Sequence, residues 1–361
     1  MCTFIKKLLK LIAWLLLIVF LVFAGFIVYI TITDYQPEQV EVLVEEGTYP
    51  NVQKLQQDTF SLMNWNIGYA GLGQEMDFFY DGGEGVGPTK ELSEKYLNSI
   101  VDFVVGNDSV DFWLLQEIDV KSKRTYRENQ VNVLTNAKEG SYSVYAMNYK
   151  VPFVPVPVTN PMGLVEAGLM TFSNFPPAEA LRYAYPLIAA WPDKLFLLDR
   201  CFILNRYPLE NGSDLVIFNT HNSAYVYDSV LRIEELQIIK KVMLAEYNKG
   251  NYVIAGGDWN QNPPGYQPSG DYNTHKFFPS IVKMNFDFMP NGWTWAYDDS
   301  APTNRQNDKP FIIGENGTTC LDYYLVSPNI EIIDVEVIDL KFEHSDHNPI
   351  YIKAHLKTES D

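Results

Sequence analysis

The chain has 361 residues, 47% hydrophobic and 14% aromatic, so it can bury one large domain without disulfide or metal staples. Lys and Arg number 27 against 45 Asp and Glu, and the formal net charge of -18 disfavours a protein that coats nucleic acid. The cysteines show no C-x-x-C spacing, so we predict Cys201 and Cys320 to be buried strand residues, with a disulfide between them as the less favoured alternative.

The first predicted element is an uncharged apolar segment. Leu11 to Ile32 form 22 residues without a charged side chain, and a helix of this length spans roughly 33 Å, enough to cross a bilayer. Signal-peptide cores are shorter, about 7 to 15 residues, and no A-x-A cleavage site follows, so a retained anchor is favoured over a removed signal. Lysines 6, 7 and 10 precede the segment and acidic residues follow it. The positive-inside rule then predicts a single-pass protein with a cytoplasmic N-terminus and an extracytoplasmic domain, with residues 1–33 as cytoplasmic tip and anchor.

A linker and one large domain follow the anchor. Residues 34–58 are acidic, contain Pro37 and Pro50 and lack a sustained apolar period, so we expect a linker with one short strand at VEVLV, residues 40–44. Regular apolar patterning begins at Thr59 and continues to Lys357. We therefore predict a single folded domain over 59–357 and a short tail at 358–361.

Strands outnumber helices in this domain. Apolar β-branched runs predict strands at 59–69, 110–118, 142–149, 168–173, 199–207, 214–221, 252–255, 318–326, 330–338 and 348–356. Apolar residues at helical spacing predict helices at 89–105 and 228–250. Many strands with few interspersed helices favour an α/β fold, namely a four-layer sandwich of two packed mixed β-sheets flanked by helices and preceded by one transmembrane helix.

Polar residues follow the ends of several predicted strands. In NYVIAGGDWNQNP an apolar strand stops at two glycines, and Asp258 and Asn260 come directly after them. At the carboxyl ends of strands in α/β proteins, such side chains commonly face a ligand-binding crevice. Taken alone, each is more often a turn or structural residue. The full set is Asn66, Glu117, His221, Asp258, Asn260, Asp322, Asp346 and His347.

In this order, the set resembles the motifs of the endonuclease/exonuclease/phosphatase superfamily, whose fold is similar to that of deoxyribonuclease I. The superfamily includes bacterial sphingomyelinases and inositol-polyphosphate phosphatases. The resemblance covers about Thr59 to Lys357 and rests on NWNIG, LLQEID, NTHNSA, D-x-N at 258–260, LDYYLVS and S-D-H at 345–347. Two departures, residues 149–163 and the acidic glycine-rich stretch at 78–87, leave the substrate open.

The resemblance implies a hydrolase of phosphate esters with Mg²⁺ as cofactor, and Mn²⁺ or another divalent cation as alternatives. It implies metal binding by Asn66, Glu117 and Asp346, whose carboxylate and amide oxygens suit a hard cation. It implies that Asp322 orients His347, and it leaves either Asp258 or His347 as the general base. The implied catalytic residues are His221, Asp258, Asn260, Asp322 and His347, of which His221 and Asn260 also contact the substrate phosphate.

Two further stretches have competing interpretations. In DVKSKRTY, Arg124 stands in a basic cluster that is either a solvated turn or an anion clamp, in which Arg124 binds the substrate phosphate. The stretch VPFVPVPV, residues 151–158, is excluded from a central strand by its prolines. We expect it to form an extended cover, and the alternative is that Phe153 and its neighbours contact lipid.

Three functions from different classes are compatible with the sequence. The favoured one is a phosphoesterase that acts outside the membrane on a small or lipid-linked phosphate ester. The first alternative is a membrane-anchored extracytoplasmic nuclease, which the net charge of -18 disfavours because a nuclease groove is basic. The second is a catalytically silent binding protein with the same fold. The sequence leaves the oligomeric state open.

Overall fold

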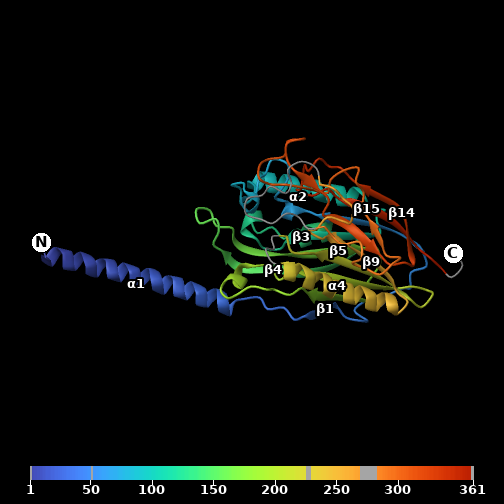
Figure 1. Cartoon of the computed structure of the whole chain (residues 1–361), viewed down its shortest axis with the longest axis horizontal. Coiled ribbons are helices and arrows are strands. Elements are labelled where there is room, and N and C mark those ends of the chain that lie inside the picture. Colours follow the sequence, from blue (N-terminus) through green and yellow to red (C-terminus); the bar gives the residue numbers. More distant parts are fainter. Residues whose placement is uncertain (1, 50–51, 225–228, 269–282, 359–361) are drawn as a thin grey trace.

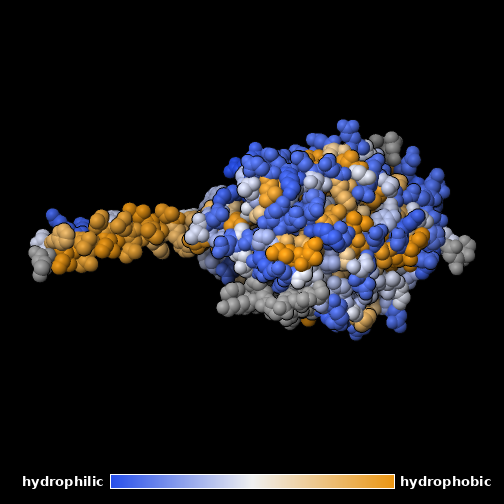
Figure 2. Space-filling view, turned by 90° about the horizontal axis from the view of Figure 1, so that it is seen from above, coloured by the Kyte–Doolittle hydropathy of each residue, from blue (hydrophilic) through white to orange (hydrophobic). Residues whose placement is uncertain are grey.

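A long apolar helix and a layered body make up the chain. The computed structural model describes residues 2–49, 52–224, 229–268 and 283–358, so Pro50, Asp228 and residues 359–361 of the predicted linker, helix and tail lie outside the described residues. Helix α1 (Cys2–Ile32) projects from one end of the body, and the C-terminus lies at the opposite end (Figure 1). It is long and apolar enough to cross a membrane, and apolar residues cover it, whereas hydrophilic residues dominate the body in the same view (Figure 2).

Two mixed sheets form the body. The first has seven strands in the order β1-β6-β7-β8-β9-β13-β10, and the second has six in the order β14-β15-β2-β3-β5-β4. The first contains β1 (Val40–Val44), β6 (Glu179–Ala184), β7 (Cys201–Pro208), β8 (Asp214–His221), β9 (Tyr252–Asp258), β13 (Asp322–Val326) and β10 (Thr294–Ala296). The second contains β14 (Ile330–Val337), β15 (Ile350–Leu356), β2 (Thr59–Asn66), β3 (Phe112–Asp119), β5 (Gly163–Ser173) and β4 (Tyr142–Val154). A short ribbon joins β11 (Asn304–Arg305) to β12 (Thr318–Thr319).

Helices cover the outer faces of both sheets. Thr89 caps α2 (Lys90–Gly106) by accepting from the Leu92 N–H, and Asn129 caps α3 (Gln130–Ala137) by accepting from the Asn132 N–H. The third helix of the body is α4 (Ser229–Asn248). The described 3-10 turns are η1 (Gly68–Ala70), η2 (Phe79–Asp81), η3 (Lys123–Thr125) and η4 (Asp193–Phe196).

Three apolar clusters define the layers. Phe112 of β3 and Ile254 of β9 belong to the cluster between the sheets. Ile239 and Met243 of α4 pack on the outer face of the first sheet, and Tyr96 of α2 packs, with its neighbours, on the outer face of the second. The order helix, sheet, sheet, helix confirms the predicted four-layer α/β sandwich.

The predicted elements are found with shifted ends. Strand 318–326 is interrupted at Cys320 and Leu321, and α3, β6, β10 and β11 were not predicted. Cys201 and Cys320 are buried and free, as favoured, and no disulfide joins them. The predicted strand at 40–44 is β1, which pairs antiparallel with β6, so part of the expected linker is built into the first sheet. Pro152 lies inside β4, which is tolerated because β4 is an edge strand.

Candidate active site

The site lies where two parallel strand pairs end. β2 runs parallel to β3 in the second sheet, and β8 runs parallel to β9 in the first, while the other paired neighbours are antiparallel. The carboxyl ends of parallel neighbours meet at one edge of their sheet. All nine predicted site residues except Asp322 and Asn66 line one cavity at these ends, and those two contact residues that do.

Strand register in the first sheet aligns three of the predicted residues. His221 of β8 is the partner of Asp258 in β9, and Asp258 is the partner of Asp322 in β13. The His221 Nε2 atom lies 3.5 Å from Asp258 Oδ2. A Cβ atom on Gly257 would lie 2.0 Å from the Thr220 carbonyl oxygen, so only glycine allows β9 to run this close to β8. The glycine pair thereby fixes where Asp258 stands.

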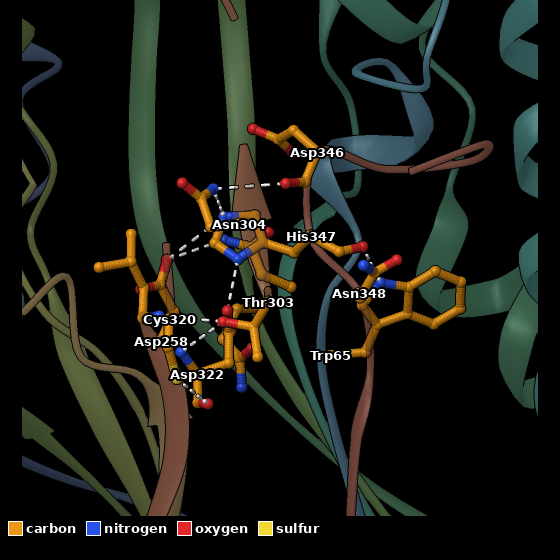
Figure 3. Close-up of polar contacts among 12 residues, drawn as sticks. Trp65, Asp258, Thr303, Asn304, Cys320, Asp322, Asp346, His347 and Asn348 are labelled. Carbon is orange, nitrogen blue, oxygen red and sulfur yellow. Dashed lines mark hydrogen bonds and ion pairs between the residues drawn. The ribbon is translucent and has the colours of Figure 1, made fainter. Parts of the chain in front are cut away.

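His347 lies between two aspartates (Figure 3). Its Nδ1 atom is 2.7 Å from Asp322 Oδ2, and its Nε2 atom is 3.9 Å from Asp258 Oδ2 and 2.8 Å from Asn304 Nδ2. The predicted pairing of Asp322 with His347 is therefore present in the geometry. Burial acts to lower the pKa of His347, but the Asp322 carboxylate outweighs it and raises this pKa, which favours the charged imidazolium.

The second sheet contributes Asn66 and Glu117. The Asn66 amide donates to Asp258 Oδ2 at 3.0 Å and to Glu117 Oε1 at 3.4 Å, while its oxygen accepts from the Gly68 N–H. Pairing between β3 and β5 shifts register between Leu115 and Ile118, and Glu117 has a positive φ of 58°. This bulge leaves the Glu117 side chain 28% exposed at the cavity, although its strand is otherwise buried.

Glu117 and Asp346 fit a divalent cation. Burial raises the pKa of the Glu117 carboxyl, and the charge of Asp346 raises it further, so a cation beside both would relieve their repulsion. A Cβ atom on Gly68 would lie 2.7 Å from Asp346 Oδ1, which means that glycine keeps this carboxylate accessible. No three His, Cys, Asp or Glu side chains converge as a metal site within the described ranges. Two carboxylates suffice for Mg²⁺, which usually keeps several waters.

Burial influences the charge states of His221 and Asp258. Burial lowers the pKa of His221, and the Arg200 charge lowers it further, so the neutral imidazole is favoured. Its Nδ1 atom is buried and has no hydrogen-bond partner among the described residues. Burial raises the pKa of the Asp258 carboxyl, and the nearby Asp322 also raises it, against the opposing charge of His347.

Asn260 lies at the cavity wall beside Asp258. It has a positive φ of 50°, and its backbone N–H donates to Asp258 Oδ1 at 2.9 Å. Its side-chain amide donates to the Asn222 carbonyl oxygen at 2.8 Å. The D-x-N spacing therefore produces a local turn that holds both side chains at the end of β9.

Arg124 reaches the cavity, but its donors face a carboxylate. Its Nε and Nη2 atoms donate to the two oxygens of buried Asp119 at 3.0 and 2.9 Å, and its guanidinium stacks on the Tyr69 ring at 3.5 Å. The bidentate fork predicted for phosphate is thus directed at Asp119. Arg200 also lines the cavity, and its Nη1 atom is buried without a hydrogen-bond partner among the described residues.

The cavity combines a polar wall with an apolar one. Its volume is about 400 Å³, within the range of small-molecule sites. The seven predicted site residues that line the cavity form the polar wall together with Arg200 and Asn304. The apolar wall includes Leu72, Phe78, Tyr149, Met162, Phe196 and Leu198. Such a cavity accommodates an ionic group next to a hydrocarbon or ring.

Three candidate functional residues were not predicted from the sequence. Asn304, which contacts His347, and Asn307, whose amide donates to Asp346 Oδ2 at 2.7 Å, lie in a segment without apolar periodicity. Arg200 immediately precedes β7 and looks in sequence like an ordinary surface residue. No sequence motif comparable to D-x-N marks these three residues, because their positions depend on how distant segments pack.

Comparison with known proteins identifies the family whose model this chain matches. Residues 63–347 match the model of the Endonuclease/Exonuclease/phosphatase family. Inositol phosphosphingolipids phospholipase C of Schizosaccharomyces pombe (strain 972 / ATCC 24843) is 29% identical over 168 residues, which are 43% of this chain and 36% of that protein. The match therefore spans little more than a third of the length of this relative.

Solved structures share the fold. An endonuclease/exonuclease/phosphatase from Beutenbergia cavernae DSM 12333 superposes with a TM-score of 0.57 at 16% identity, covering 83% of this chain and 72% of that one. ANGEL2, a 2',3'-cyclic phosphatase, superposes with a TM-score of 0.52 at 13% identity, covering 84% of this chain and 96% of that one. At these identities the likeness concerns the fold alone.

Proposed function

This chain belongs to the endonuclease/exonuclease/phosphatase family, and on that basis we propose that it is a metal-dependent phosphoesterase acting outside the membrane on a lipid-linked or small phosphate ester. One observation carries the proposal: Glu117, His221, Asp258, Asp346 and His347, which come from distant parts of the sequence, line one cavity of about 400 Å³. This set supplies both carboxylates for a cation and groups that move protons.

A divalent cation, with Mg²⁺ as the expected ion, would be held by Glu117 and Asp346. When bound, it would neutralise charge on the phosphoryl oxygens. Asn66 supports this arrangement from outside, because its amide donates to both Glu117 and Asp258. Burial and the charge of Asp346 raise the pKa of the Glu117 carboxyl, so a bound cation would favour its ionised form.

We assign Asp258 as the general base, which accepts a proton from the attacking water. Asp258 lines the cavity, and its Oδ2 atom lies 3.0 Å from Asn66 Nδ2 and 3.5 Å from His221 Nε2. The Nε2 atom of a neutral His347 would already be occupied by the Asn304 amide at 2.8 Å. His347, which is charged through its contact with Asp322, instead stabilises negative charge on the phosphoryl group. His221 forms a hydrogen bond with the leaving oxygen.

Arg200 is the side chain we propose for phosphate binding, and Asn260, which also lines the cavity, is proposed as a second contact. The buried Nη1 atom of Arg200 has no hydrogen-bond partner among the described residues, so an anion would satisfy it. Arg124 keeps its ion pair with Asp119 and supports the wall. A lipid-linked ester is favoured over a small one because the apolar wall of the cavity lies beside these groups, and because the Schizosaccharomyces pombe relative is by its name a phospholipase C.

A substrate panel tests the proposal. The full chain would be assayed with phosphosphingolipid, glycerophospholipid, sugar phosphate and nucleic acid, each with Mg²⁺ and with a chelator. We expect Mg²⁺-dependent hydrolysis of a lipid substrate that the Asp258→Asn variant loses. Preferred cleavage of nucleic acid would identify a nuclease instead, and the absence of turnover on every substrate would favour a silent binding protein.

A further inference from the structure

The last turns of α1 are packed against the body. The Phe26 ring lies 5.9 Å from the Phe153 ring of β4 and 6.4 Å from the Phe196 ring of η4. Ile30 is only 1% exposed, and Trp191 Nε1 donates to Thr31 Oγ1 at 3.2 Å. By contrast, the apolar side chains from Phe4 to Phe23 are largely exposed. The helix therefore has a free apolar portion and a portion fixed to the body.

Helix length places the fixed portion at membrane depth. Phe26 follows Lys10 by 16 residues, which is roughly 24 Å along a helix. The hydrocarbon core of a bilayer is about 30 Å thick, so a helix that enters it at Lys10 still has Phe26 inside it. Phe153 and Phe196 contact Phe26, and they must then lie at the depth of the leaflet nearest the body.

Exposed apolar side chains lie on the two segments that contact α1. They come from the end of β4 with the following loop, and from the segment between β6 and β7, and we call them the collar. Val158 is 88% exposed, and Trp191 is also exposed although it contacts α1. The collar consists of Phe153, Val156, Val158, Leu187, Ile188, Trp191 and Leu197. In water these side chains would be unfavourably placed, whereas at a lipid interface their burial is favourable.

The collar continues into the wall of the cavity. Phe196 contacts α1 on one side and lines the active-site cavity on the other, and its carbonyl oxygen accepts from the Tyr149 hydroxyl at 3.2 Å. Leu197 belongs both to the collar and to the cavity lining. An apolar path therefore leads from the surface around α1 to the site that contains Glu117 and Asp258.

We propose that the collar is a bilayer-binding surface that seats the body on the leaflet around α1 and turns the apolar wall of the cavity toward the lipid. The occupant is the acyl region of that leaflet, because the collar is continuous with the membrane-spanning part of the chain. The substrate is drawn from the same membrane, with its phosphate at the polar wall and its hydrocarbon along Phe196 and Leu197. This last statement about the substrate rests on the proposed function.

Depth-dependent quenching tests the surface without using activity. In a Cys2→Ser background, Val158→Cys would carry a polarity-sensitive fluorophore, and the full chain would be reconstituted in phosphatidylcholine bilayers with and without brominated acyl chains. Cys201 and Cys320 are buried and should not react. We expect brominated lipid to reduce emission at position 158 at least twofold.

The matched control is Ile333→Cys in β14. Ile333 is 54% exposed and apolar, and β14 lies on the side of the body away from α1 (Figure 1). Its emission should be unchanged by brominated lipid. Equal emission with both lipids at position 158, or equal quenching at both positions, would overturn the proposal.

A second comparison links the collar to turnover. Val158→Glu should lower hydrolysis of a phospholipid in bilayers about fivefold and leave hydrolysis of a water-soluble phosphodiester unchanged, because position 158 does not line the cavity. Ile333→Glu should change neither. An equal loss on both substrates would contradict a membrane role for the collar. If the parent protein hydrolyses neither substrate, the proposed function fails, while the quenching result still decides whether the collar contacts lipid.

Discussion

Single residues in this site are held in conformations that their type does not favour. Glu117 and Asn260 both have positive φ values. This conformation costs about 1 to 3 kcal/mol for Glu117, and it costs Asn260 less because Asn adopts the left-handed region more readily. The bulge in β3 imposes the first, and the turn after β9 imposes the second. These backbone conformations reduce local stability, but they direct both side chains into one cavity.

Removing the charge of Glu117 should weaken the cation site. Glu117→Gln keeps the size and the contact with Asn66, so the fold should persist while Mg²⁺ affinity and turnover fall by orders of magnitude. Calorimetric titration of Mg²⁺ into both proteins measures the affinity directly. Glu128→Gln, an exposed glutamate remote from the cavity lining, is the control and should bind Mg²⁺ as the parent does. Unchanged affinity in Glu117→Gln would exclude Glu117 from the cation site.

Asp322 and His347 should act as one unit. Asp322 acts on the reaction only through its contact with His347 Nδ1. His347→Ala and Asp322→Ala should therefore each reduce hydrolysis about 10² to 10⁴-fold, and the double variant should lose little more activity than either single variant. A double-mutant cycle on kcat gives the coupling, with circular dichroism to verify folding because Asp322 is fully buried. Fully additive losses would show that the pair does not cooperate.

Arg124 and Arg200, two of the arginines that line the cavity, should behave differently on substitution. Arg200→Gln removes a donor that is free for phosphate, so KM should rise about tenfold while the melting temperature stays near that of the parent. Arg124→Gln leaves buried Asp119 unpaired and should lower the melting temperature by several degrees. Steady-state kinetics and thermal unfolding of both variants make the comparison. A normal KM in Arg200→Gln would remove it from phosphate binding.

Sequence reasoning at this scale succeeded where a residue's place follows from its strand. The family resemblance implied His221, Asp258 and Asp322 together, and in the structure the register of β8, β9 and β13 aligns them. It failed for the direction of Arg124, since a guanidinium binds a carboxylate as readily as a phosphate and Asp119 is only five residues away. Asn304 and Arg200 could not be predicted because long-range packing decides their positions.

At the scale of elements, apolar periodicity located the strands and helices with strong patterns. It missed α3, which has only eight residues, and β6 and β10, which are short strands near the edge of the first sheet. Short elements bury too few apolar residues to leave a periodic signal, and tertiary pairing stabilises them instead. The layer order could be predicted because it depends on the long elements.

A half-buried ion-pair cluster joins α4 to the first sheet, and it should make the stability of the protein depend on pH in acid. Arg206 of β7 contacts Glu179, Asp214 and Glu246, and Glu246 of α4 also accepts from Asn251. Burial acts to raise the pKa of Glu246, but hydrogen bonds from Arg206 and Lys249 outweigh it and lower this pKa from 4.5 to about 2. Its contribution is therefore complete above pH 4.5 and is lost as the pH falls toward 2.

Glu246→Gln should reduce the free energy of unfolding by about 1 to 3 kcal/mol at pH 7. Its deficit relative to the parent should shrink as the pH falls from 4.5 toward 2, since the parent glutamate becomes protonated there. Thermal unfolding across this range measures the difference. Glu94→Gln, which breaks an exposed pair with Lys90, should change stability by less than about 0.5 kcal/mol at any pH. A stability deficit of Glu246→Gln that stays the same from pH 4.5 to 2 would contradict the lowered pKa of Glu246.

At the scale of the whole molecule, α1 and the charges around it set the expected topology. The full chain should stay in the membrane fraction after washing with salt, and residues after Thr33 should be accessible to protease added outside intact cells. The pattern of protected fragments, detected with an antibody to the N-terminus, gives the orientation. Release of the protein by salt, or protection of the body from external protease, would contradict it.

The pairing of β1 with β6 limits how far the body can travel from its anchor. Only seven residues separate Ile32 from Val40, and fully extended they reach at most about 25 Å. If the substrate is a lipid of the surrounding membrane, as proposed, an enzyme on so short a tether would meet it by lateral diffusion in two dimensions. Its rate should follow the number of substrate molecules per unit area of the surrounding membrane, and diluting the vesicles in buffer at constant lipid composition should leave that rate unchanged.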